Sequence, residues 1–353
     1  MTSNNDQNTG LNEALDRIAG ESSNAEMNVS WRTWLAASTV QERGIEIMKI
    51  VLENLRQGRF IGSKLVANFI SDLASTCKNN EENFITIARL KNSTNYTYAH
   101  PVNVCVYCIA LGSRLKLNDK QILQLGIAAL LHDIGEVKLP DRMTSKSAKF
   151  TESEFAAMQR HPRLGYEILK RDPTIPEDSL MGIFHHHERL DGSGYPSGHV
   201  GRFIHPFGRI ISVAETFDAM TTSRSRADAV PPSEALKTLY SLAGKHYEAN
   251  VVKALISLLG IYPMGSLVRL AGGQLAVVLQ QSKEDLSKPQ VIVISDATGQ
   301  RIDPYVVNLY GDKVERKIMY AENAYTLDID TNGVIYDTLA NSTEVSQITD
   351  RKI

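Results

Sequence analysis

The sequence predicts a mainly α protein: a helical bundle with an N-terminal helical domain and a small C-terminal β-rich extension. Apolar residues recur at helical spacing from Trp31 to about residue 262. Beyond that point, short apolar runs separated by glycine are typical of strands. The expected organisation is a disordered tail over residues 1–28, a helical domain over 29–92, a larger helical domain over 93–262, and a β-rich extension with a polar tail over 263–353.

Composition excludes several classes of protein. The chain has 353 residues, of which 42% are hydrophobic and 22% charged, as in ordinary soluble globular proteins. A formal net charge of −2 indicates no general affinity for a nucleic-acid polymer or an acidic membrane. No apolar run reaches the roughly 20 residues that cross a bilayer, and the first residues lack the features of a signal peptide. Three cysteines argue against a disulfide scaffold, so we expect a cytoplasmic protein.

The N-terminal helical domain carries no chemical motif. Residues 1–28 are rich in Asn, Ser, Glu and Asp and bury too little apolar surface to offset the entropy of ordering. Two amphipathic helices are expected around residues 47–55 and 61–73, and a shorter one over 82–90. Sensing a signal, forming a homodimer, binding a signalling protein and extending the core are the roles left open for this domain.

The larger helical domain has recognisable helix starts. Helices are expected over residues 98–111, 119–131, 206–218 and 233–242, with a further one opening at Thr151. Asn118 is a candidate N-cap, and Thr151 with Glu154 has the spacing of a capping box. The helix over 119–131 is apolar almost all round and is therefore buried, so His132 and Asp133 emerge where a central helix ends.

The C-terminal extension reads as short strands. Residues 266–270 and 275–279 flank a Gly272-Gly273 turn and predict a hairpin. Two further strands are expected over residues 291–294 and 305–309, followed by a polar tail after residue 341.

Histidine and aspartate gather in a pattern that packing does not explain. Residues 184–196 read FHHHERLDGSGYP and contain three of the nine histidines, while His132 and Asp133 form a second pair. A lone histidine is more often a satisfied core or surface residue, and any one of these residues is a weak indication. Together they would leave many buried polar groups without partners, at about 1–3 kcal/mol each. Imidazole and carboxylate ligands suit a divalent first-row metal, so the joint pattern predicts a metal site.

At residues 96–262 the chain resembles the HD-GYP domain, a bacterial branch of the HD phosphohydrolases. The resemblance rests on His132-Asp133-Ile134-Gly135 and on residues 186–196, HHERLDGSGYP, with the segments Pro140-Asp141, 149–151 and 158–162 in family order between them. It implies an HD-type helical bundle and hydrolysis of a cyclic dinucleotide, chiefly cyclic di-GMP and in some members cyclic GMP-AMP. Attack by a metal-bridging hydroxide would open the ring to a linear dinucleotide.

The resemblance also implies a ligand set for two divalent ions, iron or manganese. One ion would be held by His100, His132, Asp133 and Asp218. Asp133 would bridge to a second ion held by His161, His186 and His187. Two ions so placed clamp a phosphoryl group and activate a water molecule. His185, Glu188 and Asp191 are expected to support the site, with Glu188 orienting a ligand imidazole. His199, His205 and His246 match no ligand position.

Candidate substrate contacts surround this set. Glycine and proline in residues 191–196 favour a tight turn that lets Tyr195 stack on or bond to substrate, although a purely structural turn is the rival interpretation. Arginine and lysine side chains suit phosphates, but each is more often part of a solvated face. The candidates are Lys149, Arg189, Arg209 and Arg224.

Several positions depart from the family pattern. Glu136 stands where the family usually has a lysine that touches substrate phosphate, so the local charge is reversed; it joins Asp133 as a candidate catalytic residue. Tyr96 stands where three-metal members carry glutamate, which favours two metals. Ser225-Arg226 and Glu248-Ala249, beside Arg224 and Tyr247, also differ and are expected to affect the substrate rim.

Three hypotheses follow. The first is a cyclic-dinucleotide phosphodiesterase. The second is a metal-containing cyclic-dinucleotide receptor or interaction module with little turnover, motivated by Glu136. The third is an HD phosphohydrolase acting on other phosphoesters, against which the Gly194-Tyr195-Pro196 loop weighs. The Cys105 and Cys108 pair has no second pair to complete a zinc site and is expected in the core.

Overall fold

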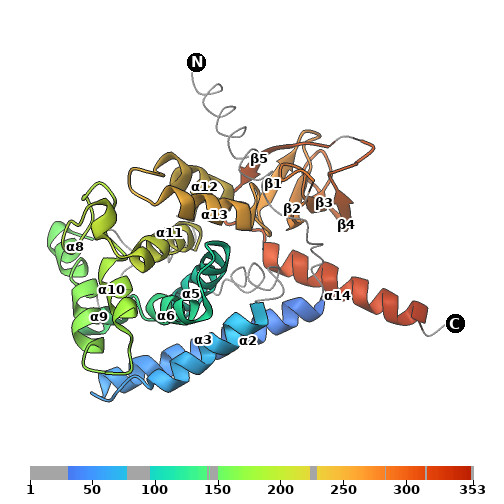
Figure 1. Ribbon diagram of the computed structural model, residues 1–353. Coiled ribbons are helices and arrows are strands. Elements are labelled where there is room, and N and C mark those ends of the chain that lie inside the picture. Colours follow the sequence, from blue (N-terminus) through green and yellow to red (C-terminus); the bar gives the residue numbers. More distant parts are fainter. Residues whose placement is uncertain are drawn as a thin grey trace.

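The computed structural model describes residues 31–77, 96–140, 143, 150–222, 229–282, 284–314 and 316–350. The expected tail over residues 1–28 and the expected helix over 82–90 lie outside these ranges. The described chain forms a mainly α fold with a small C-terminal antiparallel sheet, as the sequence predicts (Figure 1). No helix in the described ranges is both long and apolar enough to span a bilayer.

The two N-terminal helices are α2 (Trp31–Arg56) and α3 (Ser63–Cys77). Both pack against α5 (Tyr96–Arg114), and α3 also packs against α6 (Asp119–Leu130). Val51 and Phe69 are buried in the same apolar cluster as Val102 and Leu125, so these helices share one core with the bundle behind them. The domain boundary expected at residue 92 stays a prediction.

The bundle continues from α5 and α6 through short helices to α13. Its further helices are η2 (Ile134–Lys138), α8 (Glu152–Met158), α9 (His161–Leu169), α10 (Glu177–His185), η3 (Gly201–Phe203), α11 (Pro206–Thr221), α12 (Pro232–Ser241) and α13 (Ala249–Leu259). Both predicted caps are present: Asn118 and Gln121 form a capping box on α6, and Thr151 and Glu154 form one on α8. Cys105 and Cys108 are buried and unbridged, as expected of core residues.

A five-stranded antiparallel sheet follows the bundle, in the order β4-β3-β2-β1-β5. Its strands are β1 (Leu267–Leu270), β2 (Leu275–Gln280), β3 (Gln290–Ser295), β4 (Arg301–Asn308) and β5 (Ile318–Glu322). The predicted hairpin is present, with Leu267 opposite Val277. Alternate residues of the strands join the bundle core on one face, among them Val277 and Ile292, while Val278 and Val291 form a small second core on the other.

Helix α14 (Thr331–Asp350) is not predicted from the sequence and extends into the expected polar tail, which stays a prediction. Its sequence is rich in Asn, Ser and Thr, which favour helices weakly, so the helix is not evident from propensity. Ile335 and Leu339 are nevertheless buried in the main core, and α14 contacts both α2 and the sheet (Figure 1). Tertiary packing of this one apolar stripe therefore stabilises a helix that local sequence does not predict.

Candidate metal centre

The candidate centre lies where α6 and α10 end and where η2 and α9 begin. His132 and Asp133 follow α6, His161 opens α9, and His186 and His187 follow α10. Gly135 makes this convergence possible, because a Cβ atom there would lie 2.0 Å from the carbonyl oxygen of His161. The backbone of η2 therefore lies directly against the start of α9, and Asp133 faces His161.

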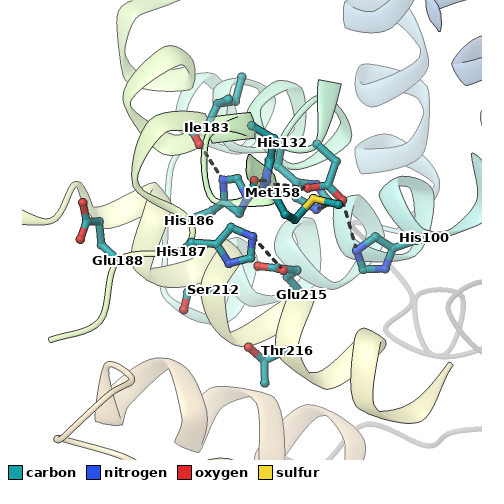
Figure 2. Close-up of polar contacts among 12 residues, drawn as sticks. His100, His132, Met158, Ile183, His186, His187, Glu188, Ser212, Glu215 and Thr216 are labelled. Carbon is teal, nitrogen blue, oxygen red and sulfur yellow. Dashed lines mark hydrogen bonds and ion pairs between the residues drawn. The ribbon is translucent and has the colours of Figure 1, made fainter. Parts of the chain in front are cut away.

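Three of the histidines are oriented by the same backbone contact. Nδ1 of His132 lies 2.8 Å from the carbonyl oxygen of Ala129, Nδ1 of His161 lies 2.8 Å from that of Met158, and Nδ1 of His186 lies 2.6 Å from that of Ile183. Figure 2 shows the contact between His186 and Ile183. A carbonyl oxygen only accepts, so each Nδ1 donates to it and each Nε2 is turned toward the interior of the cluster. The three Nε2 atoms face one another, which is the arrangement that a metal ion requires.

Asp133 stands between two groups of donors. Its Oδ1 lies 3.2 Å from Nε2 of His161, and its Oδ2 lies 3.1 Å from Nε2 of His132. The residues form two sets, within each of which the ligand atoms all lie within 4.8 Å of one another, and Asp133 belongs to both sets. The sets are Asp133, His161, His186 and His187, and His100, His132 and Asp133. Six of the seven predicted ligands are thus brought together.

Asp218 lies behind His100. Its Oδ2 lies 2.7 Å from Nδ1 of His100, and its Oδ1 accepts hydrogen bonds from Asn103 and Thr222. Nε2 of His100 then points to Asp133, 3.8 Å from its Oδ2. In this geometry Asp218 orients an imidazole, and its predicted role as a direct ligand stays a prediction.

Glu215 is a candidate ligand that sequence reasoning missed. Its Oε1 lies 3.5 Å from Nε2 of His187, as Figure 2 shows. Its Oε2 is buried and makes no hydrogen bond within the described part of the chain; Nε2 of His132 is in the same condition. Buried polar atoms without partners are rare in native structures, and here both adjoin the donor cluster. The available indication was the three-residue spacing from Asp218, which puts both carboxyl groups on one side of α11.

The electrostatics of the cluster follow from burial and from Asp133. Burial opposes protonation of His132, but the adjacent Asp133 carboxylate outweighs it and raises the pKa of His132 to about 9. Despite burial, His132 and His161 hold the pKa of Asp133 well below its usual range. Burial lowers the pKa of His186 and of His187, which leaves both rings neutral and able to bind a cation, and burial raises the pKa of Glu215.

Glu188 and His185, which were expected to support the site, form hydrogen bonds with the backbone around it. Glu188 points away from the cluster in Figure 2, and its two carboxylate oxygens accept hydrogen bonds from the backbone N–H groups of Ser197 and His199 at 2.8 and 3.0 Å. Glu188 therefore holds the loop after Tyr195, and its expected role in orienting a ligand imidazole stays a prediction. His185 accepts from the backbone of His205 through Nδ1, and burial lowers its pKa to about 4.

Asp191 has a structural role in its turn. It accepts hydrogen bonds from the backbone and hydroxyl of Ser193, and its other oxygen lies 3.3 Å from Nε2 of His246. The rival interpretation of a structural turn thus describes this end of the loop.

The basic candidates are largely engaged within the protein. Arg189 donates to the Ser212 hydroxyl at 2.8 Å and lies over the Tyr247 ring, and Arg209 pairs with Glu248 at 3.0 Å. Tyr247 and Glu248, the second of which departs from the family pattern, thereby hold these arginines. Lys149, Arg224, Ser225 and Arg226 lie outside the described residues.

Tyr195 and Glu136 do lie at the centre. The Tyr195 ring stacks on His187 with centroids 4.5 Å apart, and burial raises the pKa of its hydroxyl, so the phenol stays protonated. Glu136 lines a small pocket with His100, Asp133 and Tyr96, whose ring stacks on His100. An acidic side chain therefore borders the cluster on the η2 side.

Relatives of known name match this part of the chain. A cyclic di-GMP phosphodiesterase of Pseudomonas aeruginosa is 34% identical over 70% of this chain and 59% of its own length. A cyclic di-GMP phosphodiesterase response regulator of Xanthomonas campestris is 35% identical over 52% of this chain and 50% of its own. A 3′3′-cGAMP-specific phosphodiesterase of Vibrio cholerae is 32% identical over 54% of this chain and 36% of its own. The chain thus spans about half the length of the curated relatives it matches.

Fold and family agree with the resemblance. An HDG"Y"P protein from Bdellovibrio bacteriovorus superposes with a TM-score of 0.56 at 19% identity, over 73% of this chain and 81% of that one, which shows a common fold. The family model described as HD domain matches residues 65–251, more than half of the sequence. In keeping with its similarity to the HD-GYP branch, the chain belongs to the HD domain family.

Proposed function

We propose that this chain is a metal-dependent phosphodiesterase that hydrolyses a cyclic dinucleotide to a linear dinucleotide. The observation that carries the proposal is the inward-facing donor set, in which backbone carbonyls fix three imidazoles with Nε2 toward Asp133. The names of the relatives supply the substrate class, since they are called phosphodiesterases of cyclic di-GMP or of 3′3′-cGAMP.

The residues present fit a pair of divalent cations. His161, His186, His187 and Asp133 would hold one ion, with Glu215 beside His187 as a further carboxylate. His100, His132 and Asp133 would hold the other, with Asp218 supporting His100. Mixed imidazole and carboxylate donors suit iron or manganese. When bound, two such ions lower the pKa of a water molecule and offset the negative charge of a phosphodiester.

The chain's own residues position the reactants. In the hydrolysis, the oxygen of a water molecule forms a bond to phosphorus, one phosphorus–oxygen ester bond breaks, and a proton reaches the departing ribose oxygen. Tyr195 keeps its proton at neutral pH and is therefore a hydrogen-bond donor beside His187. The carboxylate of Glu188 holds residues 197–199, so the loop that carries Tyr195 is fixed at the mouth of the site.

The test is product formation by protein purified without oxygen and with its metal content measured. Cyclic di-GMP and 3′3′-cGAMP are supplied side by side, with Asp133→Asn as the inactive control. About two ions per chain with linear product from the wild type, and loss of both in the variant, are expected. Full turnover by Asp133→Asn would refute the proposal.

A second candidate function is a cyclic-dinucleotide receptor with little turnover. It is favoured by the engagement of Arg189 and Arg209 within the protein and by the acidic Glu136 beside the cluster, which together leave fewer cations to neutralise a phosphate. Tight binding of cyclic di-GMP to the metal-loaded protein without product would establish the receptor. Rapid turnover under the same conditions would exclude it.

A further inference from the structure

A short series of aromatic rings leads from the candidate centre to solvent. His187 stacks on Tyr195, and the Tyr195 ring meets the Phe155 ring edge to face, with centroids 6.4 Å apart and an interplanar angle of 82°. The Phe155 side chain is 49% exposed. An aromatic surface thus begins at a candidate metal ligand and ends at a ring that is open to solvent.

Helix α8 holds Phe155 at a fixed place relative to the centre. A capping box of Thr151 and Glu154 closes the start of the helix. At its end, the carbonyl of Met158 accepts the hydrogen bond from Nδ1 of His161. Phe155 lies three residues before Met158, which places both on the same side of the helix. The position of the ring is therefore coupled to that of His161.

Single exposed apolar residues are common on protein surfaces and usually need no explanation. Phe60 and Phe203 are more exposed, at 71% and 65%, yet among the residues described neither has a ring contact with a residue of the centre. Phe155 is distinguished by its contact with Tyr195. Tyr195, expected from the sequence to stack on the substrate, has one face against His187, so Phe155 offers the more accessible ring.

We propose that Phe155 is the base-stacking residue of the substrate site. A purine base of the cyclic dinucleotide lies against the Phe155 ring while the adjoining phosphodiester lies at the His/Asp cluster. The inference rests on the proposed function and adds to it a residue that determines specificity. Stacking recognises the flat face of a base and not its hydrogen-bonding edge, so it favours purines as a class and does not separate guanine from adenine.

The experiment compares Phe155→Ala, Phe155→Leu and Phe155→Trp in the metal-loaded full chain, with Phe60→Ala as the matched control. The readouts are KM and kcat with cyclic di-GMP, and the Kd of the same ligand by calorimetry. Loss of one stacking contact raises KM and Kd roughly 5- to 150-fold in Phe155→Ala, from about 1–3 kcal/mol per stacked base. Leucine restores little of this, tryptophan restores most of it, and kcat stays within about twofold. Cyclic di-UMP has smaller bases, so its Kd rises less in Phe155→Ala than the Kd of cyclic di-GMP does.

Each outcome separates the inference from the proposed function. If the wild type turns over cyclic di-GMP and Phe155→Ala has an unchanged KM and Kd, the inference is wrong and the proposed function stands. If the wild type binds without turnover and Kd rises in Phe155→Ala but not in Phe60→Ala, the site is a receptor and the inference stands. If the wild type neither binds nor hydrolyses cyclic di-GMP or 3′3′-cGAMP, both are wrong. A kcat that falls with KM unchanged in Phe155→Ala also overturns the inference, because it would assign the ring to the reacting centre.

Discussion

Nε2 of His161 lies 3.1 Å from Nε2 of His186, while each ring's Nδ1 contacts a backbone carbonyl oxygen. Because both carbonyl oxygens accept hydrogen bonds from Nδ1, the two Nε2 atoms face each other inside the protein. This contact is unfavourable unless a proton or a metal ion lies between the rings. Burial lowers the pKa of His186 well below its usual range, whereas Asp133 raises the pKa of His161 despite burial, so without metal the proton would lie on His161 and a divalent ion would take its place.

Removing metal should therefore lower thermal stability. A ligand present at a hundred times its Kd stabilises the folded state by about 2.7 kcal/mol. At an unfolding entropy of about 2.1 cal/mol/K per residue, this corresponds for a 353-residue chain to a fall of about 4 °C in Tm on chelation, measured by calorimetry and reversed by Mn²⁺.

The His186→Ala variant should lose this response to Mn²⁺. His199→Ala is the matched control, because His199 lies outside both donor groups and its side chain is 40% exposed. An unchanged metal response in His186→Ala would show that the facing pair does not bind the ion.

Conservative substitutions can distinguish the roles of Glu215 and Asp218, the two carboxylates of α11. Glu215→Gln removes the charge beside His187 and should lower the metal content by about one ion per chain. Asp218→Asn keeps an oxygen that can accept from His100, so two ions should remain with affinity weakened about 10–100-fold, as for residues that orient metal ligands. Metal quantification by mass spectrometry at several metal concentrations distinguishes the two cases. If Asp218→Asn loses an ion and Glu215→Gln keeps both, Asp218 is a direct ligand, as predicted from the sequence.

The contrast between Asp218 and Glu215 indicates how far the sequence leads. His132 and Asp133 were predictable because an all-apolar helix ends beside them, and Asn118 and Thr151 because a cap is a local pattern. Glu215 lies 28 positions beyond His187, and on a helix an isolated glutamate usually belongs to the solvated face. Only the packing of α10 against α11 brings the two side chains together.

Glu188 and α14 make contacts that the local sequence does not predict, for a related reason. The position of Glu188 beside His187 suggested a metal-supporting role, but its carboxylate turns toward backbone N–H groups that lie nine and eleven residues later. Helix α14 forms because Ile335 and Leu339 reach the common core, a long-range contact that residue propensities do not contain.

Gly135 should tolerate no side chain. A Cβ atom there would lie 2.0 Å from the carbonyl oxygen of His161 and 2.5 Å from the backbone nitrogen of Gly165, and backbone atoms cannot rotate away. Gly135→Ala should therefore lower the free energy of unfolding by about 1–3 kcal/mol or more and move Asp133 away from His161, with loss of metal. Gly272→Ala is the control, since a Cβ there meets only the end of the Gln274 side chain. Denaturant unfolding and metal quantification measure both effects, and a Gly135→Ala protein with wild-type stability would contradict the close packing of η2 on α9.

Glu188→Ala should impair substrate binding while leaving metal binding intact. The substitution removes both acceptors from the backbone N–H groups of Ser197 and His199, each an uncompensated group worth about 1–3 kcal/mol where it stays buried. The loop that carries Tyr195 then loses its anchor, so we expect KM for cyclic di-GMP to rise about tenfold with two ions still bound. The amide of Glu188→Gln keeps one acceptor oxygen, so its KM should lie between the values of Glu188→Ala and the wild type. Loss of metal from Glu188→Ala would instead mean that this carboxylate supports a ligand imidazole, because only a residue coupled to the centre would change its metal content.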